Sequence, residues 1–227
     1  MVKDDYIFLV WQDPKTRSRM VVGELLKKNG YKFFYTGDYE KARQLGWEML
    51  KPFPEVREYE SDVVFPVFSS RLPDPKRRDI NDILQEYGLK AYDEFELLKR
   101  SGARLPIDSY EFVNPIFPED ESILRKFYVS GVRHCGPCEG DDCSKLKGIC
   151  VGDELNLSHE PDNVIDSNAV IIFNKEGMKI GYVPSYYCKA VVERLKKGMT
   201  YSCTVLEVNL NRYCRECVKV ELKMPKE

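Results

Sequence analysis

Six short apolar runs follow one another within residues 127–222, and they constrain the fold of this half of the chain most strongly. Short runs rich in β-branched and aromatic residues, bounded by Gly, Asn, Asp or Pro, are typical of strands. One helix interrupts the series, with Pro184 at its first turn and Gly198 after its last turn. Several short strands with a single helix predict a small, partly open β-barrel of OB type. The expected strands are Phe127–Arg133, Glu154–Ser158, Ala169–Phe173, Lys179–Val183, Tyr201–Val208 and Cys217–Leu222.

The first half of the chain has a different pattern, which predicts a small sheet followed by helices. Tyr6–Trp11 has the composition of a buried strand, and Asn29-Gly30 between two apolar runs predicts a hairpin. Apolar residues at helical spacing then predict helices, with Asp or Gly at several of the boundaries. The fold class is therefore α+β. The expected hairpin strands are Met20–Leu26 and Tyr31–Tyr35, and the expected helices are Tyr39–Leu45, Asp62–Phe68, Arg77–Tyr87 and Asp93–Leu98.

The segment NPIFPED, residues 114–120, separates these two patterns and has the composition of a linker. We therefore predict a front domain over residues 1–113, a linker over 114–122 and a barrel over 123–227. The cysteines support two domains, because all eight lie at or beyond Cys135. No apolar run is long enough to cross a bilayer, and the start MVKDDYIFLVWQD lacks the long apolar region of a signal peptide. We expect a cytoplasmic protein.

The charge balance excludes one class of nucleic-acid binder. Residues 1–118 carry 19 Lys and Arg against 20 Asp and Glu, and the remainder carries 16 against 17. A strong non-specific duplex binder usually has an excess of basic residues, so any nucleic-acid site must be local. No Ser/His/Asp set, carboxylate pair or phosphate-binding loop is evident, and His134 and His159 form no obvious site. We expect no catalytic activity from this chain.

The most specific motif is EPDNVIDSNAVIIFN, residues 160–174, followed by MKIGYVP. Asp162, Asn163, Asp166 and Asn168 cluster just before a predicted strand. Asn and Asp side chains bond to nearby backbone groups and build tight turns. The motif is therefore either a well-made turn or a turn that also presents binding groups.

The order of FYVSGVRH, then VGDELNLSHEPDNVIDSNAV, then MKIGYVP and a helix resembles the HIRAN domain. That family is a small modified OB-like module, found alone in bacteria and attached to DNA-remodelling helicases elsewhere. The resemblance covers roughly residues 127–222 and implies DNA binding, in the best-known case to the three-prime end of a single strand. In that case an Arg-Tyr pair, a Tyr-Asp pair in the Asx turn and a later His form the pocket.

The resemblance implies that Arg133 corresponds to the arginine of that pocket. It also implies that Asp166 corresponds to the aspartate that contacts the terminal hydroxyl. Three positions depart from the family pattern. His134 stands in place of the stacking tyrosine, Ile165 in place of the tyrosine before the aspartate, and Tyr182 in place of the histidine. Ile165 cannot stack on a base, whereas His134 and Tyr182 still offer flat faces. The candidate nucleic-acid-binding residues are Arg133, His134, Asn163, Asp166, Asn168 and Tyr182.

The first half of the chain also has a family resemblance. VVGELLKKNGYKFFY, then FPVFSSRLPDPKRRDINDILQEYGL, then FELLKRSGARLPID resembles the N-terminal subdomain of HipA-type toxin kinases, over residues 21–108. There the subdomain packs on a kinase core and helps to bind the antitoxin, without catalysis of its own. No kinase signature follows here. The pairing of both domains implies a bacterial protein, and the alternative function is a toxin–antitoxin-type interaction module without DNA-end recognition.

The cysteines form two CxxC pairs, Cys135/Cys138 and Cys214/Cys217. Zinc binds four soft ligands in a tetrahedron, and the two pairs meet if the first and last barrel strands are neighbours. Reduced thiols without metal remain the alternative, and Cys143 or His134 could replace one ligand. A thioredoxin-type redox site fits poorly, because an acidic loop rather than a helix follows Cys138. We expect core thiols at Cys150, Cys188 and Cys203.

Overall fold

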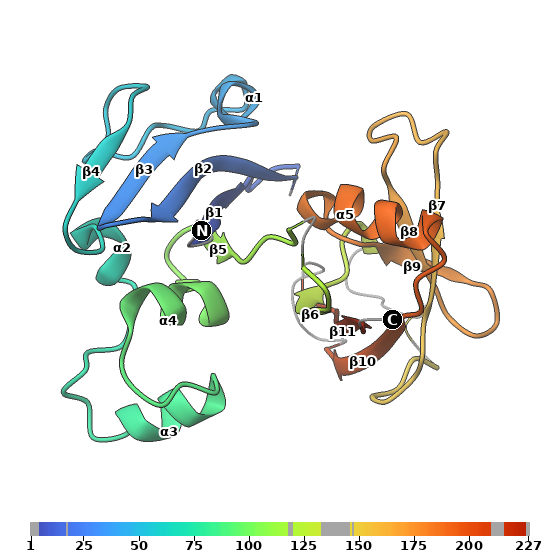
Figure 1. Cartoon of the computed structure of the whole chain (residues 1–227). Helices are drawn as coiled ribbons and strands as arrows, with labels where there is room; N and C mark the ends of the chain where they lie inside the picture. Colours follow the sequence, from blue (N-terminus) through green and yellow to red (C-terminus); the bar gives the residue numbers. More distant parts are fainter. Residues whose placement is uncertain are drawn as a thin grey trace. The chain divides into compact units, whose positions relative to one another are not determined.

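The computed structural model describes residues 5–16, 18–117, 120–132, 146, 148–209 and 216–225. The chain divides into two compact units, residues 1–115 and 116–227. The first is a sheet with short helices, and the second is built mainly from strands, so the α+β class is confirmed (Figure 1). Over the described residues no helix is both long and apolar enough to span a membrane.

The first unit is built on a five-stranded antiparallel sheet in the order β4-β3-β2-β1-β5. The predicted hairpin is confirmed: Asn29 and Gly30, with φ of 47° and 109°, turn the chain between β2 and β3. Two strands were not predicted, β4 and β5, which are short and lie at the two edges of the sheet. The strands are β1 (Asp5–Gln12), β2 (Arg19–Lys27), β3 (Tyr31–Tyr35), β4 (Tyr59–Ser61) and β5 (Tyr110–Val113).

The helices of the first unit are short. The Asp93 side chain caps α4 by accepting a hydrogen bond from the Glu96 N–H at 3.0 Å, and Gly102 ends the helix with a left-handed φ of 73°. The predicted helix over Asp62–Phe68 was too long, because helical geometry begins only at Pro66. The helices are α1 (Tyr39–Gln44), α2 (Pro66–Ser69), α3 (Ile80–Glu86) and α4 (Glu94–Ser101).

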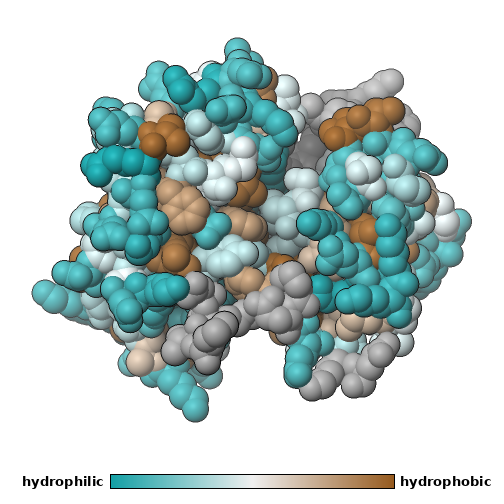
Figure 2. All heavy atoms as spheres, turned by 45° about the horizontal axis from the view of Figure 1, so that its top comes forward, coloured by the Kyte–Doolittle hydropathy of each residue, from teal (hydrophilic) through white to brown (hydrophobic). Residues whose placement is uncertain are grey.

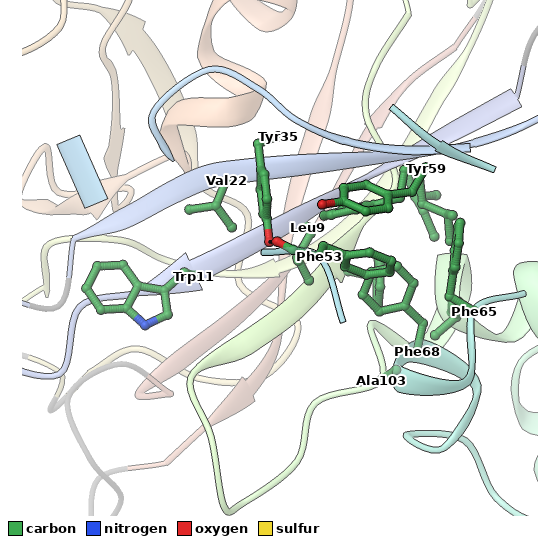
Figure 3. Close-up of a cluster of buried hydrophobic side chains, with 14 of the residues drawn as sticks. Leu9, Trp11, Val22, Tyr35, Phe53, Tyr59, Phe65, Phe68 and Ala103 are labelled. Atoms are coloured by element: carbon green, nitrogen blue, oxygen red, sulfur yellow. Dashed lines mark hydrogen bonds between the residues drawn. The ribbon is translucent and has the colours of Figure 1, made fainter. Parts of the chain in front are cut away.

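Apolar side chains of this unit gather in an aromatic core (Figure 3). The surface of the chain that Figure 2 shows is largely hydrophilic, with small, separate hydrophobic patches. Phe33 is fully buried, and its ring centroid lies 4.6 Å from that of Phe53 and 5.1 Å from that of Phe68. Gly23 makes room for it, since a Cβ there would lie 2.6 Å from the Phe33 ring. The Tyr35 hydroxyl donates to the Phe53 carbonyl at 2.7 Å, so this polar group of the core is satisfied.

The second unit consists of two three-stranded antiparallel sheets and one helix. The sheet orders are β10-β11-β6 and β7-β8-β9. The first and last strands of the unit, β6 and β11, pair over Tyr128↔Lys219 to Ile123↔Met224, as expected for a barrel. The elements are β6 (Ile123–Tyr128), β7 (Asn156–His159), β8 (Val170–Phe173), β9 (Lys179–Tyr182), α5 (Ser185–Lys196), β10 (Ser202–Val208) and β11 (Val218–Met224).

The predicted first strand, Phe127–Arg133, ends early in the structure, and the reason is a change of partner. After β6, the Val129 N–H still donates to the Val218 carbonyl of β11 at 2.9 Å. Ser130 instead pairs with Tyr182 of β9. Gly181 allows this approach, because a Cβ there would lie 2.5 Å from the Ser130 carbonyl oxygen. The chain therefore passes from one sheet to the other at this point.

The segment before β6 belongs to the second unit. Ile116 and Phe117 are buried there. The buried Arg194 of α5 donates to the carbonyls of Phe117 and Asp120, both at 2.9 Å. Part of the sequence predicted as a linker is thus attached to α5.

Candidate nucleic-acid interface

The loop between β7 and β8, residues 160–169, is a turn built by its own Asx side chains. Asn163 Oδ1 accepts hydrogen bonds from the backbone N–H of Ile165 at 3.0 Å and of Asp166 at 3.1 Å. Asp166 Oδ1 accepts from the Asn168 N–H at 2.8 Å. These bonds replace backbone partners that an irregular loop otherwise lacks. The loop is therefore ordered by the residues that the sequence motif singled out, and it projects at the upper right of Figure 1.

The Asp166 carboxylate is half-buried and only partly used by the turn. Its Oδ1 holds the loop, whereas its Oδ2 makes no hydrogen bond with any part of the chain that the structure describes. An ionised carboxylate accepts hydrogen bonds at both oxygens. One acceptor of Asp166 is therefore available to a ligand, while the Asn168 backbone N–H serves the turn.

Tyr182 joins this loop to β9 through a small polar cluster. Its hydroxyl donates to Glu160 Oε2 at 3.0 Å and accepts from Lys179 Nζ at 2.5 Å. Asn163 Nδ2 donates to the same Glu160 oxygen at 2.5 Å and lies 3.4 Å from the Tyr182 hydroxyl. The hydrogen bond from Asn163, with help from Tyr182 and Lys179, holds the pKa of Glu160 below its ordinary value. We call Glu160, Asn163, Lys179 and Tyr182 the polar cluster.

The ring of Tyr182 is also partly covered. Lys179 Nζ lies over it, 4.2 Å from the ring centroid. A Cβ added at Gly131 would come within 3.3 Å of the ring edge. Tyr182 is therefore fixed by its neighbours, and one of its faces is occupied by an ammonium group.

Comparison with known proteins decides the family of the second unit, since residues 126–223 match the HIRAN domain. These residues form a HIRAN domain. Residues 17–106 match the HipA N-terminal domain. The HIRAN match supports a role in nucleic-acid binding in general.

Two solved structures are similar to this chain. A protein from Lactobacillus plantarum is 19% identical over 45% of this chain and 94% of that chain, with a TM-score of 0.38. The HIRAN domain of human HLTF is 16% identical over 47% of this chain and 81% of that chain, with a TM-score of 0.36. A search of curated proteins finds no match.

The structure brings together four of the six candidate residues of the HIRAN domain: Asn163, Asp166, Asn168 and Tyr182. The other two, Arg133 and His134, lie outside the described residues. Sequence reasoning missed Glu160 and Lys179. Regular strand alternation would place positions 179 and 182 on opposite faces. A register shift brings them to the same side, because Tyr182 pairs with Ile171 and Lys179 with Phe173, and simple alternation does not predict this bulge.

The structure describes only one of the four predicted zinc ligands. Cys217 is buried just before β11, and Cys135, Cys138 and Cys214 lie outside the described residues. The described residues contain no group of His, Cys, Asp or Glu that could hold a metal, but they include only one of these ligands. The zinc site therefore stays a prediction.

The remaining thiols differ from one another. Cys188 and Cys203 are buried core thiols, as expected, and burial raises the pKa of each to about 12. The expectation was wrong for Cys150, which is exposed and lies in a turn. Its backbone N–H donates to Asp153 Oδ2 at 2.8 Å, and this bond closes the turn before β7.

Proposed function

We propose that the HIRAN domain of this chain binds single-stranded DNA at a free three-prime end. The observation that carries the proposal is the available Oδ2 of Asp166, held in an ordered turn beside Tyr182. A carboxylate accepts a hydrogen bond from a terminal hydroxyl and repels a terminal phosphate. Such a group distinguishes a hydroxyl end from a phosphorylated end.

The other candidate residues have supporting roles in this proposal. Arg133 contacts the backbone phosphate near the end, since guanidinium groups commonly bind phosphate oxygens. His134 offers a flat face to a base. Asn163 and Asn168 keep the turn in the conformation that presents Asp166. The chain acts by binding in the cytoplasm, without a catalytic step of its own.

The test is fluorescence anisotropy with one labelled single strand that ends in a three-prime hydroxyl, a dideoxy sugar or a three-prime phosphate. We expect the hydroxyl end to bind at least about tenfold more tightly than the other two, because a hydrogen bond to a charged group is lost. Equal affinity for the three ends would refute end recognition.

Asp166→Asn is the informative variant, because Asn keeps an acceptor for the Asn168 N–H and so preserves the turn. We expect it to bind the phosphorylated and hydroxyl ends with similar affinity. Asp162→Asn, an exposed residue of the same loop, is the matched control and should retain the preference.

A second candidate function is a toxin–antitoxin-type interaction module that uses the front domain without DNA-end recognition. The match to the HipA N-terminal domain supports it, and the front domain exposes large apolar side chains at Val56, Val63 and Ile107. Pull-down from the host with the wild-type chain and with Val63→Ser/Ile107→Ser tests it. A partner retained by the wild type and lost by the variant favours this function, and DNA binding that depends on a free end argues against it.

A further inference from the structure

Val164 and Ile165 form an apolar tip on the β7–β8 loop of the HIRAN domain. Their side chains are 99% and 92% exposed, the highest values among the large hydrophobic side chains of the described residues. Aliphatic groups at this exposure contribute nothing to folding through burial. Two adjacent ones at the end of a projecting loop therefore suggest a contact with another molecule.

The tip is held in place by its neighbours on both sides. Asn163 Oδ1 fixes the Ile165 N–H, and the Glu160 N–H donates to the Ala169 carbonyl at 2.8 Å. His159 Nε2 lies 2.8 Å from the Ser167 carbonyl oxygen. A tip with this many anchors loses little conformational freedom on binding, so its apolar surface is available at low entropic cost.

The position of the tip indicates what it contacts. Ile165 directly precedes Asp166, whose free carboxylate oxygen is the proposed acceptor for the terminal hydroxyl. The base of that terminal nucleotide is the nearest large group of a bound strand, and it is uncharged. The nearby carboxylates of Glu160, Asp162 and Asp166 do not repel an uncharged base, whereas they repel an anionic membrane surface.

An aliphatic side chain has no π face for stacking, but it packs well against a methyl group. In nucleic acids the apolar group on a base is the C5 methyl of thymine. We infer that the Val164–Ile165 tip packs against the terminal base and selects for a pyrimidine that carries a C5 methyl. This inference rests on the proposed binding of a strand end.

The test uses pairs of oligonucleotides that differ by one methyl group at the three-prime terminal base: thymine against uracil, and 5-methylcytosine against cytosine, all on deoxyribose. Burial of one methyl group corresponds to about threefold to fourfold in affinity. We expect the methylated member of each pair to bind more tightly by this factor. Ile165→Ser should remove the preference, and Ile165→Leu should keep it.

Val151→Ser is the matched control. Val151 is 67% exposed and lies in the loop before β7, outside the β7–β8 loop that carries the tip. It should leave the preference unchanged. Equal affinities within each pair for the wild type, with the free-end preference intact, would overturn the inference and leave the proposed function standing. Absence of binding to every strand would overturn the proposed function and, with it, this inference.

Discussion

Ser130 and Tyr182 pair through their backbones in both directions, with N–H to carbonyl distances of 2.9 and 2.8 Å. The pair joins the end of β6 to β9 and so connects the two sheets of the HIRAN domain. The connection also fixes Tyr182, whose side chain holds the β7–β8 loop through Glu160. The candidate interface is thus attached to both sheets rather than to one hairpin.

Gly181→Ala should destabilise the HIRAN domain by about 1–3 kcal/mol, because overpacking by one methyl forces the backbone apart. The added Cβ would lie 2.5 Å from the Ser130 carbonyl oxygen. Chemical denaturation followed by circular dichroism measures the change. Gly177→Ala is the control: no atom lies within 4 Å of its Cβ, although its φ of 78° costs about 1 kcal/mol. Equal losses for the two variants would contradict the steric explanation.

Glu160 makes the stability of the domain depend on pH. Its pKa is lowered in the folded state, first by the hydrogen bond from Asn163. A group with a lowered folded pKa contributes stability that is present above its unfolded value of 4.5 and is lost as the pH falls through the folded value. Unfolding free energies measured from pH 7 to pH 3 should therefore decline less steeply for Glu160→Gln than for the wild type.

Tyr182→Phe provides an intermediate case for this pH dependence. It removes one donor to Glu160 and leaves Asn163 and Lys179 in place. The pH dependence should fall between those of the wild type and Glu160→Gln, and a steeper dependence than the wild type would argue against the polar cluster as its source.

Arg194→Met should cost about 2–4 kcal/mol of unfolding free energy, because it leaves the carbonyls of Phe117 and Asp120 without their donor. Amide hydrogen exchange should accelerate at residues 116–125. Lys189→Met, an exposed change on the same helix, should alter neither quantity. Undisturbed exchange in Arg194→Met would show that other contacts hold this segment.

If the predicted zinc site exists, elemental analysis should find about one equivalent of metal per chain. Replacement of Cys138 or Cys214 by Ser should remove both the metal and the folding of the domain. Cys150→Ser should retain the metal, because Cys150 is exposed and lies outside the predicted ligand set. A folded, metal-free protein with titratable thiols at Cys135 and Cys214 would refute the site.

Local signals in the sequence predicted local structure well. Asn29-Gly30 and the Asp93 to Gly102 helix were predictable because each depends on a few neighbouring residues. β4 and β5 were missed because they are short and are defined by pairing: Val113 of β5 pairs with Phe8 of β1. The exposure of Cys150 was hidden by its apolar neighbours, which resemble a strand.

In the candidate site, too, contacts between neighbouring residues were predictable and contacts between distant segments were not. The Asx turn was predictable because Asn163 and Asp166 bond within their own loop. The polar cluster was not, since the contact of Glu160 with Tyr182 exists only after β9 is in place. The early end of β6 had the same cause, because Ser130 takes its partner from β9.

The pairing of β6 with β11 has a consequence for synthesis on the ribosome. Ile123 has no sheet partner until Met224 has left the exit tunnel, and such distant pairings form slowly. A nascent chain halted before the last strand exposes the edge of β6, which is a template for aggregation. The front domain, whose last strand ends at Val113, can complete its sheet well before this point. We therefore expect translation to produce a folded front domain that carries an unfinished barrel, with the edge of β6 unpaired during this interval.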